Sequence, residues 1–254
     1  MEDDIKDIDF DFKNQTSFLN EVLPFYKEMP WDFKNDDANV NYRYKNKDSY
    51  YRYSDAVFLY LMIRKHNPQR IIEIGSGFSS AIMLDTNDLF YKNKSIQFTF
   101  IEPNPQDRLD GLINLEDRKN CKIHVEKVQN VDLSIYQELQ ENDVLFIDSS
   151  HLSKAGSDLN FIMFNILPIL KPGVIIHFHD VFYPFEYPKD WLTKERFYWN
   201  ECYLLRAFLM NNSNYEIIFF NSAAHKFQGE FLLKEMPEVM IDHIHCGALW
   251  IQKK

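Results

Sequence analysis

The sequence predicts an α/β fold, namely a doubly wound, mostly parallel sheet that follows an N-terminal helical arm. Short β-branched or apolar runs alternate along the chain with segments whose apolar residues recur at helical spacing. A glycine-containing turn directly follows the first of these runs. Strands separated by helices form right-handed βαβ units, so the strands are parallel and helices cover both faces of the sheet.

The individual elements are predicted from these patterns. We expect strands at residues 71–74, 98–102, 122–125, 143–148, 174–180, 215–220 and 248–252. We expect helices at residues 17–26, 55–66, 79–89, 104–112, 133–139, 153–167 and 195–210. Pro68 and Pro168 mark two of the helix ends, because proline cannot continue a helix.

The chain divides into two parts by composition. Residues 1–50 are polar and aromatic, and we expect an arm with one short helix there. Residues 51–254 form the main domain in this interpretation. The arm either covers the functional pocket as a lid or wraps around the domain as a structural support.

The overall charge is acidic. Lys and Arg number 28 against 38 Asp and Glu, which gives a formal net charge of −10. Nucleic-acid binding needs concentrated basic residues and is therefore disfavoured. Cys121, Cys202 and Cys246 show neither disulfide nor zinc spacing, which fits a reducing cytoplasm. We see no secretory signal and no apolar run that could span a membrane, and the sequence leaves open whether the chain forms a homodimer.

A nucleoside site is predicted where the first strand ends. Gly75, Ser76 and Gly77 lie between this strand and the next helix, where glycine lets the backbone approach a ligand closely. Glu73 precedes the turn and suits a cationic ligand better than a pyrophosphate. Glu102 ends the second strand, where a carboxylate can accept hydrogen bonds from both ribose hydroxyls of an adenosine.

Four motifs carry a resemblance to a known family. They are EIGSGFSS at 73–80, FIEPNP at 100–105, VLFIDSSH at 144–151 and LKPGVIIHFHD at 170–180. Over roughly residues 54–181 the chain resembles the class I S-adenosylmethionine-dependent methyltransferases, and it is most similar to their bacterial branch that modifies small molecules or sugars. The resemblance implies a Rossmann-like, seven-stranded sheet whose last strand is antiparallel.

The resemblance also assigns roles in binding S-adenosylmethionine. It places Gly75 and Gly77 beside the amino-acid part of the cofactor and Glu102 at the ribose. The adenine contacts would follow the third strand, at Val128, Gln129 or Asn130, and among these we take Gln129 as the candidate. Asp148 is a further candidate for contact with the cofactor.

Two clusters at strand ends carry candidate chemistry. Asp148 and His151 follow the fourth strand, and His177, His179 and Asp180 end the fifth. Alternate strand residues share a face, so the two histidines of the fifth strand should point the same way. We take His151, Asp148 and His179 as candidate catalytic residues. His177 is expected to be a polar group satisfied within the core.

A metal is a further candidate at these strand ends. Asp148 and Asp180 could share a hard cation such as Mg²⁺. This arrangement resembles the metal-dependent O-methyltransferases, which carry a basic residue three positions after the first carboxylate, where this chain has His151. Those enzymes usually follow the second Asp with Asn, but Val181 stands there in this sequence, and the histidines would favour a transition metal. The alternative for His151 is a hydrogen bond to the backbone or a cap on the helix near residue 153.

The segment at 181–201 is rich in aromatic residues and prolines, and it leaves the fifth strand where an acceptor should bind. It either forms the acceptor wall or packs over a sheet edge. The candidate wall residues are Tyr183, Glu186, Tyr187, Trp191, Arg196 and Trp199. His243, His245 and Cys246 suggest a metal site, although we expect a structural role for them.

The leading hypothesis is an S-adenosylmethionine-dependent methyltransferase that acts on a hydroxyl of a small molecule, such as a saccharide or a secondary metabolite. An NAD-dependent oxidoreductase or epimerase is the first alternative, but the glycine pattern is incomplete and no Tyr-x-x-x-Lys pair follows the fourth strand. A non-catalytic nucleoside-binding protein and an iron-dependent hydroxylase are the others. Fold alone does not decide among these functions.

Overall fold

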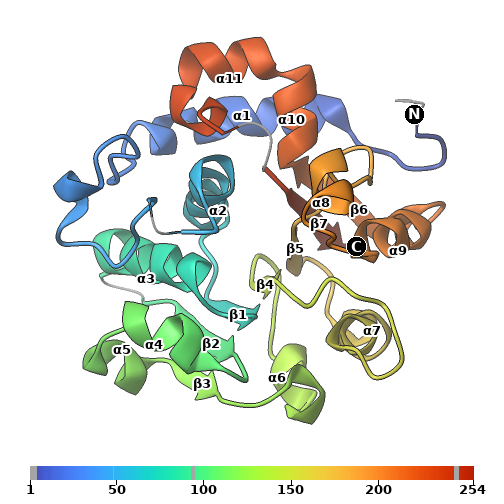
Figure 1. The fold of residues 1–254 in the computed structure, drawn as a ribbon, viewed down its shortest axis with the longest axis horizontal. Helices are drawn as coiled ribbons and strands as arrows, with labels where there is room; N and C mark the ends of the chain where they lie inside the picture. Colours follow the sequence, from blue (N-terminus) through green and yellow to red (C-terminus); the bar gives the residue numbers. More distant parts are fainter. Residues whose placement is uncertain (1–4, 48, 93–94, 243–245) are drawn as a thin grey trace.

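The computed structural model describes residues 5–47, 49–92, 95–242 and 246–254. Within them, one mixed sheet has the strand order β3-β2-β1-β4-β5-β7-β6 (Figure 1). The first five strands are parallel, and β7 is antiparallel to both β5 and β6. The expected seven-stranded, mostly parallel sheet is therefore confirmed. The strands are β1 Arg70–Ile74, β2 Gln97–Ile101, β3 Lys122–His124, β4 Val144–Ile147, β5 Ile175–His179, β6 Tyr215–Phe220 and β7 Ala248–Lys253.

Helices cover both faces of this sheet (Figure 1). Strand residues alternate between two cores: Ile71 belongs to one, and Ile72 to the other. The first core includes α1, α2, α3 and α11, and the second includes α6, α7 and α9. The α-helices are α1 Phe12–Tyr26, α2 Tyr53–His66, α3 Phe78–Phe90, α4 Leu109–Leu112, α5 Leu115–Asn120, α6 Ser134–Gln137, α7 Asp158–Phe161, α8 Lys189–Thr193, α9 Glu201–Leu209, α10 Asn221–Phe227 and α11 Gly229–Glu235.

The N-terminal arm is part of the first core. Phe18 of α1 packs on Phe219 of β6, with ring centroids 4.7 Å apart. Farther along, Arg43 forms ion pairs with Asp85 of α3 and Asp117 of α5, at 3.0 and 2.6 Å. Ile5 and Phe10, nearer the N-terminus, belong to the second core. The arm thus packs on both faces of the sheet, and Tyr50 at its end lines the functional pocket described below.

Two predicted helices begin later than expected. The helix expected at 153–167 starts at Asp158, because the Ser157 hydroxyl caps it by accepting from the Asn160 amide. The helix expected at 195–210 starts only at Glu201. Before it, Arg196 has a left-handed φ of 58° and the Phe197 amide donates to the Trp191 carbonyl, so the chain turns back on α8.

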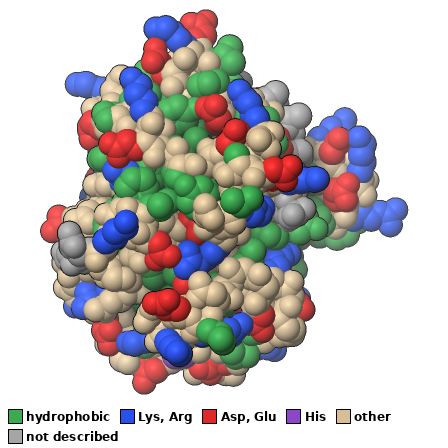
Figure 2. Space-filling model, turned by 90° about the vertical axis from the view of Figure 1, so that its left-hand side faces the viewer, with side chains coloured by type: hydrophobic (Ala, Val, Ile, Leu, Met, Phe, Trp, Pro, Cys, Tyr) green, Lys and Arg blue, Asp and Glu red, His purple; other side chains and the backbone are tan. Residues whose placement is uncertain are grey.

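The surface mixes charge types. On the face in Figure 2, acidic and basic side chains are interspersed with hydrophobic ones. In the part of the chain that the structure describes, no helix is long and apolar enough to cross a membrane.

Candidate functional site

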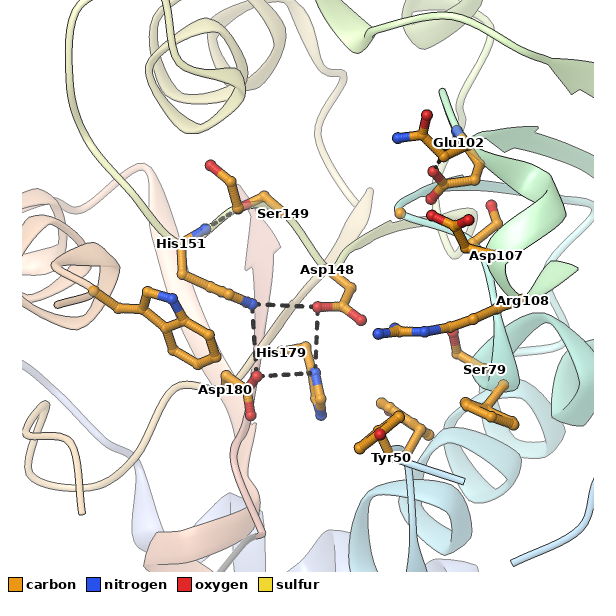
Figure 3. A pocket seen from close by; sticks show the side chains of 18 of the residues that line it. Tyr50, Ser79, Glu102, Asp107, Arg108, Asp148, Ser149, His151, His179 and Asp180 are labelled. Carbon is orange, nitrogen blue, oxygen red and sulfur yellow. Dashed lines mark hydrogen bonds and ion pairs between the residues drawn. The ribbon is translucent and has the colours of Figure 1, made fainter. Parts of the chain in front are cut away.

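A cavity of about 630 Å³ opens at the carboxyl ends of β1, β2, β4 and β5. This is the edge of a parallel sheet where ligands bind, as the sequence predicts. Its walls come from the end of the arm, the glycine turn, the loops after β2 and β4, the tip of β5 and the loop between α8 and α9 (Figure 3).

The glycine turn is packed against the end of β4. Gly75 has a φ of +82°, and a Cβ placed there would lie 1.9 Å from the carbonyl oxygen of Asp148. The Gly75 amide donates to Ile101 of β2, and the Asp148 amide donates to Ile74 of β1. Only glycine fits this close approach of two backbones. The predicted residues Gly75, Ser76 and Gly77 all line the cavity.

Glu73 lies beneath the turn and not in the cavity wall. Its side chain is fully buried, and its carboxylate accepts from the hydroxyls of Ser79 and Ser80 in the first turn of α3. Burial raises the pKa of Glu73 to about 8. The expected direct contact with a cofactor is therefore corrected: the carboxyl anchors α3 to β1. Strand alternation explains this, because odd-numbered residues of β1 face the first core.

Two further predicted cofactor residues, Glu102 and Gln129, behave differently from each other. Glu102 lines the cavity just after β2, and its carboxylate accepts from the Asn104 amide at 2.8 Å. Gln129 does not line the cavity. Its amide instead donates to the carbonyl of Gly156, which corrects the expected contact with the adenine. The turn after β3 is directed toward the loop before α7.

Sequence reasoning missed Arg108. It follows the short 3₁₀ turn at Pro105–Asp107, and its guanidinium carbon lies 5.1 Å from the ring centre of Tyr50. Figure 3 shows its side chain extending into the cavity toward Asp148. The motif FIEPNPQDR contains this basic residue, but no spacing rule connects it to the arm.

Four side chains meet at the ends of β4 and β5 (Figure 3). Nε2 of His151 lies 3.4 Å from Asp148 Oδ1 and 3.5 Å from Asp180 Oδ2. Nδ1 of His179 lies 3.4 and 3.6 Å from the same two oxygens. The structure thus brings together all four residues that the sequence selected at these strand ends. We call them the Asp-His quartet.

His177 and His179 point to the same face of β5, as expected from strand alternation. The ring of His177 stacks on Phe146 at 4.0 Å, and its Nε2 lies 3.2 Å from the Tyr51 hydroxyl. Burial lowers the pKa of His177 well below its ordinary value, so this ring is neutral. It is a buried core residue with a partner at Nε2, but its Nδ1 has no hydrogen-bond partner among the described residues, so the expectation of a fully satisfied polar group is met at one nitrogen only.

Two buried carboxylates stand behind the quartet, and sequence reasoning missed both. Glu201 Oε2 lies 2.6 Å from His151 Nδ1, and Asp55 Oδ2 lies 3.5 Å from His179 Nε2. They come from the starts of α9 and α2, far from the quartet in sequence. No local pattern could have indicated them.

The electrostatics of the site are dominated by negative charge. Burial disfavours a charge on the His151 ring, but hydrogen bonds with Asp148 and Glu201 outweigh this effect and raise the pKa of His151 to about 10. Burial also opposes ionisation of Asp148, yet His179 and His151 hold its pKa well below the usual range. For Asp180, burial raises the pKa.

This arrangement fits a divalent cation. Four carboxyl groups, those of Asp55, Asp148, Asp180 and Glu201, lie within 3.6 Å of two imidazoles. Ligand atoms of Asp148, His179 and Asp180 lie within 4.8 Å of one another. Nδ1 of His179 is buried and has no hydrogen bond of good geometry among the described residues. Oxygen donors together with an imidazole suit Mg²⁺ less well than Mn²⁺ or Fe²⁺.

Part of the predicted aromatic wall lies at the cavity. Trp191 and Trp199 line it as expected, together with Phe197, which was not predicted. The rings of Phe197 and Trp199 stack at 4.7 Å. The other candidates, which do not line the cavity, are Tyr183, Glu186, Tyr187 and Arg196.

Two of those candidates have clear structural roles. The Tyr187 hydroxyl accepts from the amide of Cys202, and Glu186 accepts from the hydroxyl of Tyr203. His243 and His245, which suggested a metal site in the sequence, lie outside the described residues.

Comparisons with known proteins support the motif analysis. Residues 72–181 match a family model described as a methyltransferase domain. A protein of Archaeoglobus fulgidus, described as uncharacterized, is 33% identical over 142 residues, which cover 56% of this chain and 62% of that protein. The chain therefore spans less than two thirds of this relative.

The fold also has a solved counterpart. The SAH-bound methyltransferase PaMTH1 of Podospora anserina superposes with a TM-score of 0.51 at 17% identity, and the match covers 93% of this chain and 88% of that one. Residues 72–181 thus match a methyltransferase domain, and the fold of the chain is the one that the resemblance to class I S-adenosylmethionine-dependent methyltransferases implies.

Proposed function

We propose that this protein is an S-adenosylmethionine-dependent methyltransferase that transfers a methyl group to a hydroxyl of a small molecule. One observation carries the proposal: the glycine turn, Glu102 and the Asp-His quartet line the same cavity. A nucleoside-binding wall and a set of proton-accepting and charged groups therefore face one another. A non-catalytic nucleoside-binding protein would not require the Asp-His quartet.

The residues around the turn suit the cofactor. The backbone at Gly75 and Gly77 leaves room for its amino-acid part, and Glu102 can accept hydrogen bonds from its ribose hydroxyls. When bound, S-adenosylmethionine supplies a methyl group on a positively charged sulfur. The excess of carboxylates in this cavity favours such a cation.

The opposite wall suits the acceptor. Trp191, Phe197 and Trp199 offer flat apolar faces on which a planar acceptor or a sugar ring can pack. Holding the acceptor in line with the methyl group is the main task, because alignment alone lowers barriers by about 7–11 kcal/mol in favourable intramolecular models. The identity of the acceptor is a matter for an acceptor screen.

His151 is the proposed base for the hydroxyl proton. Its Nε2 faces the cavity side of the quartet, while Nδ1 is held by Glu201. A raised pKa keeps this ring protonated while the surrounding carboxylates are uncompensated. The base role therefore requires that the charge of Asp148 and Asp180 be offset. A divalent cation held by Asp148, His179 and Asp180 would do this and would also polarise the acceptor hydroxyl.

Calorimetric titration with S-adenosylmethionine, and separately with NAD, tests the proposal. We expect saturable binding of S-adenosylmethionine, lost in Glu102→Ala and retained in Gln129→Ala, because only Glu102 lines the cavity. Each titration is run with Mn²⁺ and with a chelator. Binding of NAD in place of S-adenosylmethionine, or of neither ligand, would contradict the proposal.

A further inference from the structure

The start of α9 is fastened to the loop that carries His151. The Asn200 amide donates to the His151 carbonyl, and the Ser153 amide donates to the Asn200 side chain. The Asn200 side-chain amide donates in turn to the Ser153 carbonyl. Three hydrogen bonds therefore fix the backbone of the 151–153 loop to the residue that precedes α9.

The side chains on either side of Asn200 hold the imidazole itself. Trp199 packs on the ring of His151, with centroids 4.3 Å apart. Glu201, whose side chain is only 1% exposed, forms a hydrogen bond with the ring, with Oε2 lying 2.6 Å from Nδ1. His151 has a left-handed φ of 58°, a conformation that costs energy for a residue with a Cβ and persists only where surrounding contacts impose it.

We propose that Glu201 is the positioning residue of His151, and that residues 199–201 form a cradle that directs Nε2 of the ring at the reacting hydroxyl. The role of His151 as a base rests on the proposed function, whereas the contacts that hold its ring do not. Oε2 of Glu201 lies against Nδ1 of the ring, which leaves Nε2 on the side of the cavity. Nε2 is therefore the nitrogen that faces Asp148 and Asp180.

The proton transfer that this cradle serves is balanced as follows. The hydroxyl oxygen of the acceptor forms a bond to the methyl carbon, and the bond between that carbon and sulfur breaks with its electron pair remaining on sulfur. The hydroxyl proton passes to Nε2 of neutral His151. The positive charge that leaves the sulfur thus ends on the imidazole, where the Glu201 carboxylate stabilises it.

The first test needs no acceptor. A short hydrogen bond from an imidazole to a carboxylate gives a far-downfield proton resonance, and we expect one in the wild-type protein that is absent from His151→Ala. In Glu201→Gln it should move upfield, because the acceptor becomes neutral. Glu195→Gln is the control, since Glu195 lies six residues earlier in the chain and its side chain is exposed. An unchanged resonance in Glu201→Gln would overturn the proposal.

The second test uses turnover of an acceptor found by screening. We expect Glu201→Gln to bind S-adenosylmethionine normally, to keep its KM for the acceptor and to lose about 10- to 100-fold in kcat, a part of what a general base contributes. In the His151→Ala background the same substitution should cost nothing further. Glu201→Asp, which keeps the charge, should recover part of the loss.

The outcomes separate the two proposals. Glu201→Gln could lower kcat by the same factor in the wild-type protein and in His151→Ala. That result would refute the positioning role, because the effect would not depend on His151. Failure to bind S-adenosylmethionine at all would refute the proposed function, while the resonance would still report whether Glu201 holds the ring.

Discussion

Two residues near the end of β1 are strongly constrained, Gly75 by steric contact and Glu73 by burial of its carboxyl group. At the end of β1, the main chain of Gly75 passes against the main chain of Asp148, so no side chain fits. Two residues earlier, Glu73 is fully buried, and its carboxyl group accepts from the hydroxyls of Ser79 and Ser80. The backbone contact and the hydrogen bonds both restrict the turn after β1, and a substitution at each position tests its contribution.

Gly75→Ala should destabilise the protein strongly. A positive φ is costly for alanine, and its Cβ would overlap a backbone oxygen that cannot move without breaking strand pairing. We expect the free energy of unfolding in urea to fall by more than about 2 kcal/mol. Gly111→Ala is the control, because nothing lies within 4 Å of its Cβ position. An equal loss in both variants would show that the contact with Asp148 does not matter.

Glu73→Gln should change how stability depends on pH. Burial raises the pKa of Glu73 to about 8, so between about pH 4.5 and 8 the folded protein holds a proton that the unfolded chain releases. Wild-type stability therefore falls as pH rises through this window, by at most about 1.4 kcal/mol per unit from this group. Glu73→Gln lacks this proton, so its stability relative to wild type should rise from pH 5 to pH 8. Parallel curves for the two proteins in urea denaturation would contradict the assignment.

Among whole elements, the arm is joined to two helices by one cation in addition to its apolar packing. Arg43 is only 16% exposed and pairs with the buried carboxylates of Asp85 and Asp117, which belong to α3 and α5. A third partner, Asp88, lies 2.8 Å from the guanidinium. The arm, α3 and α5 are thus joined at a single point.

Arg43→Met should loosen this junction. Removing one side of a buried ion pair leaves uncompensated carboxylates, which typically costs about 3–5 kcal/mol. We expect faster proteolysis within residues 31–47 and a lower urea midpoint. Arg118→Met, which removes only the exposed pair with Asp110, is the control and should change little. Proteolysis at the wild-type rate in Arg43→Met would argue that apolar packing alone holds the arm.

Prediction from sequence succeeded best for elements with a local signal. The strands were predicted to within a residue or two, because buried parallel strands are short apolar runs. The helix at 195–210 was wrong in its first six residues, because the reversal at Arg196 uses a left-handed residue other than glycine. The helices α5, α8, α10 and α11 were not predicted. Helix α7 began at a serine cap that the sequence does contain.

The residues of the site also divide into those with a local signal in the sequence and those without one. The Asp-His quartet was predictable because its members end two neighbouring strands, and sheet order brings such ends together. Glu201, Asp55 and Arg108 were not predictable, since each reaches the site through packing between elements distant in the chain. Gln129 was misplaced because a turn's direction depends on the loop it meets.

At the scale of the whole molecule, folding concentrates carboxyl groups in the wall of one cavity and directly behind it, in an already acidic chain. Asp55, Asp148, Asp180 and Glu201 come from four different segments. Their mutual repulsion opposes folding, and a bound cation would offset it. Stability of the entire protein should therefore depend on divalent metal.

Mn²⁺ should raise the melting temperature. A ligand present at a hundred times its Kd stabilises by about 2.7 kcal/mol, which for a chain of this size shifts Tm by about 5–10 °C. The shift should vanish with a chelator and in Asp180→Asn, and it should persist in Asp190→Asn, which removes only an exposed pair with Lys194. A shift that survives Asp180→Asn would place the cation elsewhere.

The contact between Gly75 and Asp148 also bears on how related sequences diverge. What excludes a side chain at position 75 is the carbonyl oxygen of residue 148, and every amino acid supplies one. A descendant that lost the carboxylate, and its chemistry with it, would still need the glycine. A glycine at position 75 in a relative would therefore indicate only that the sheet has the same geometry. An aspartate at position 148 would be the residue that indicates retained catalysis.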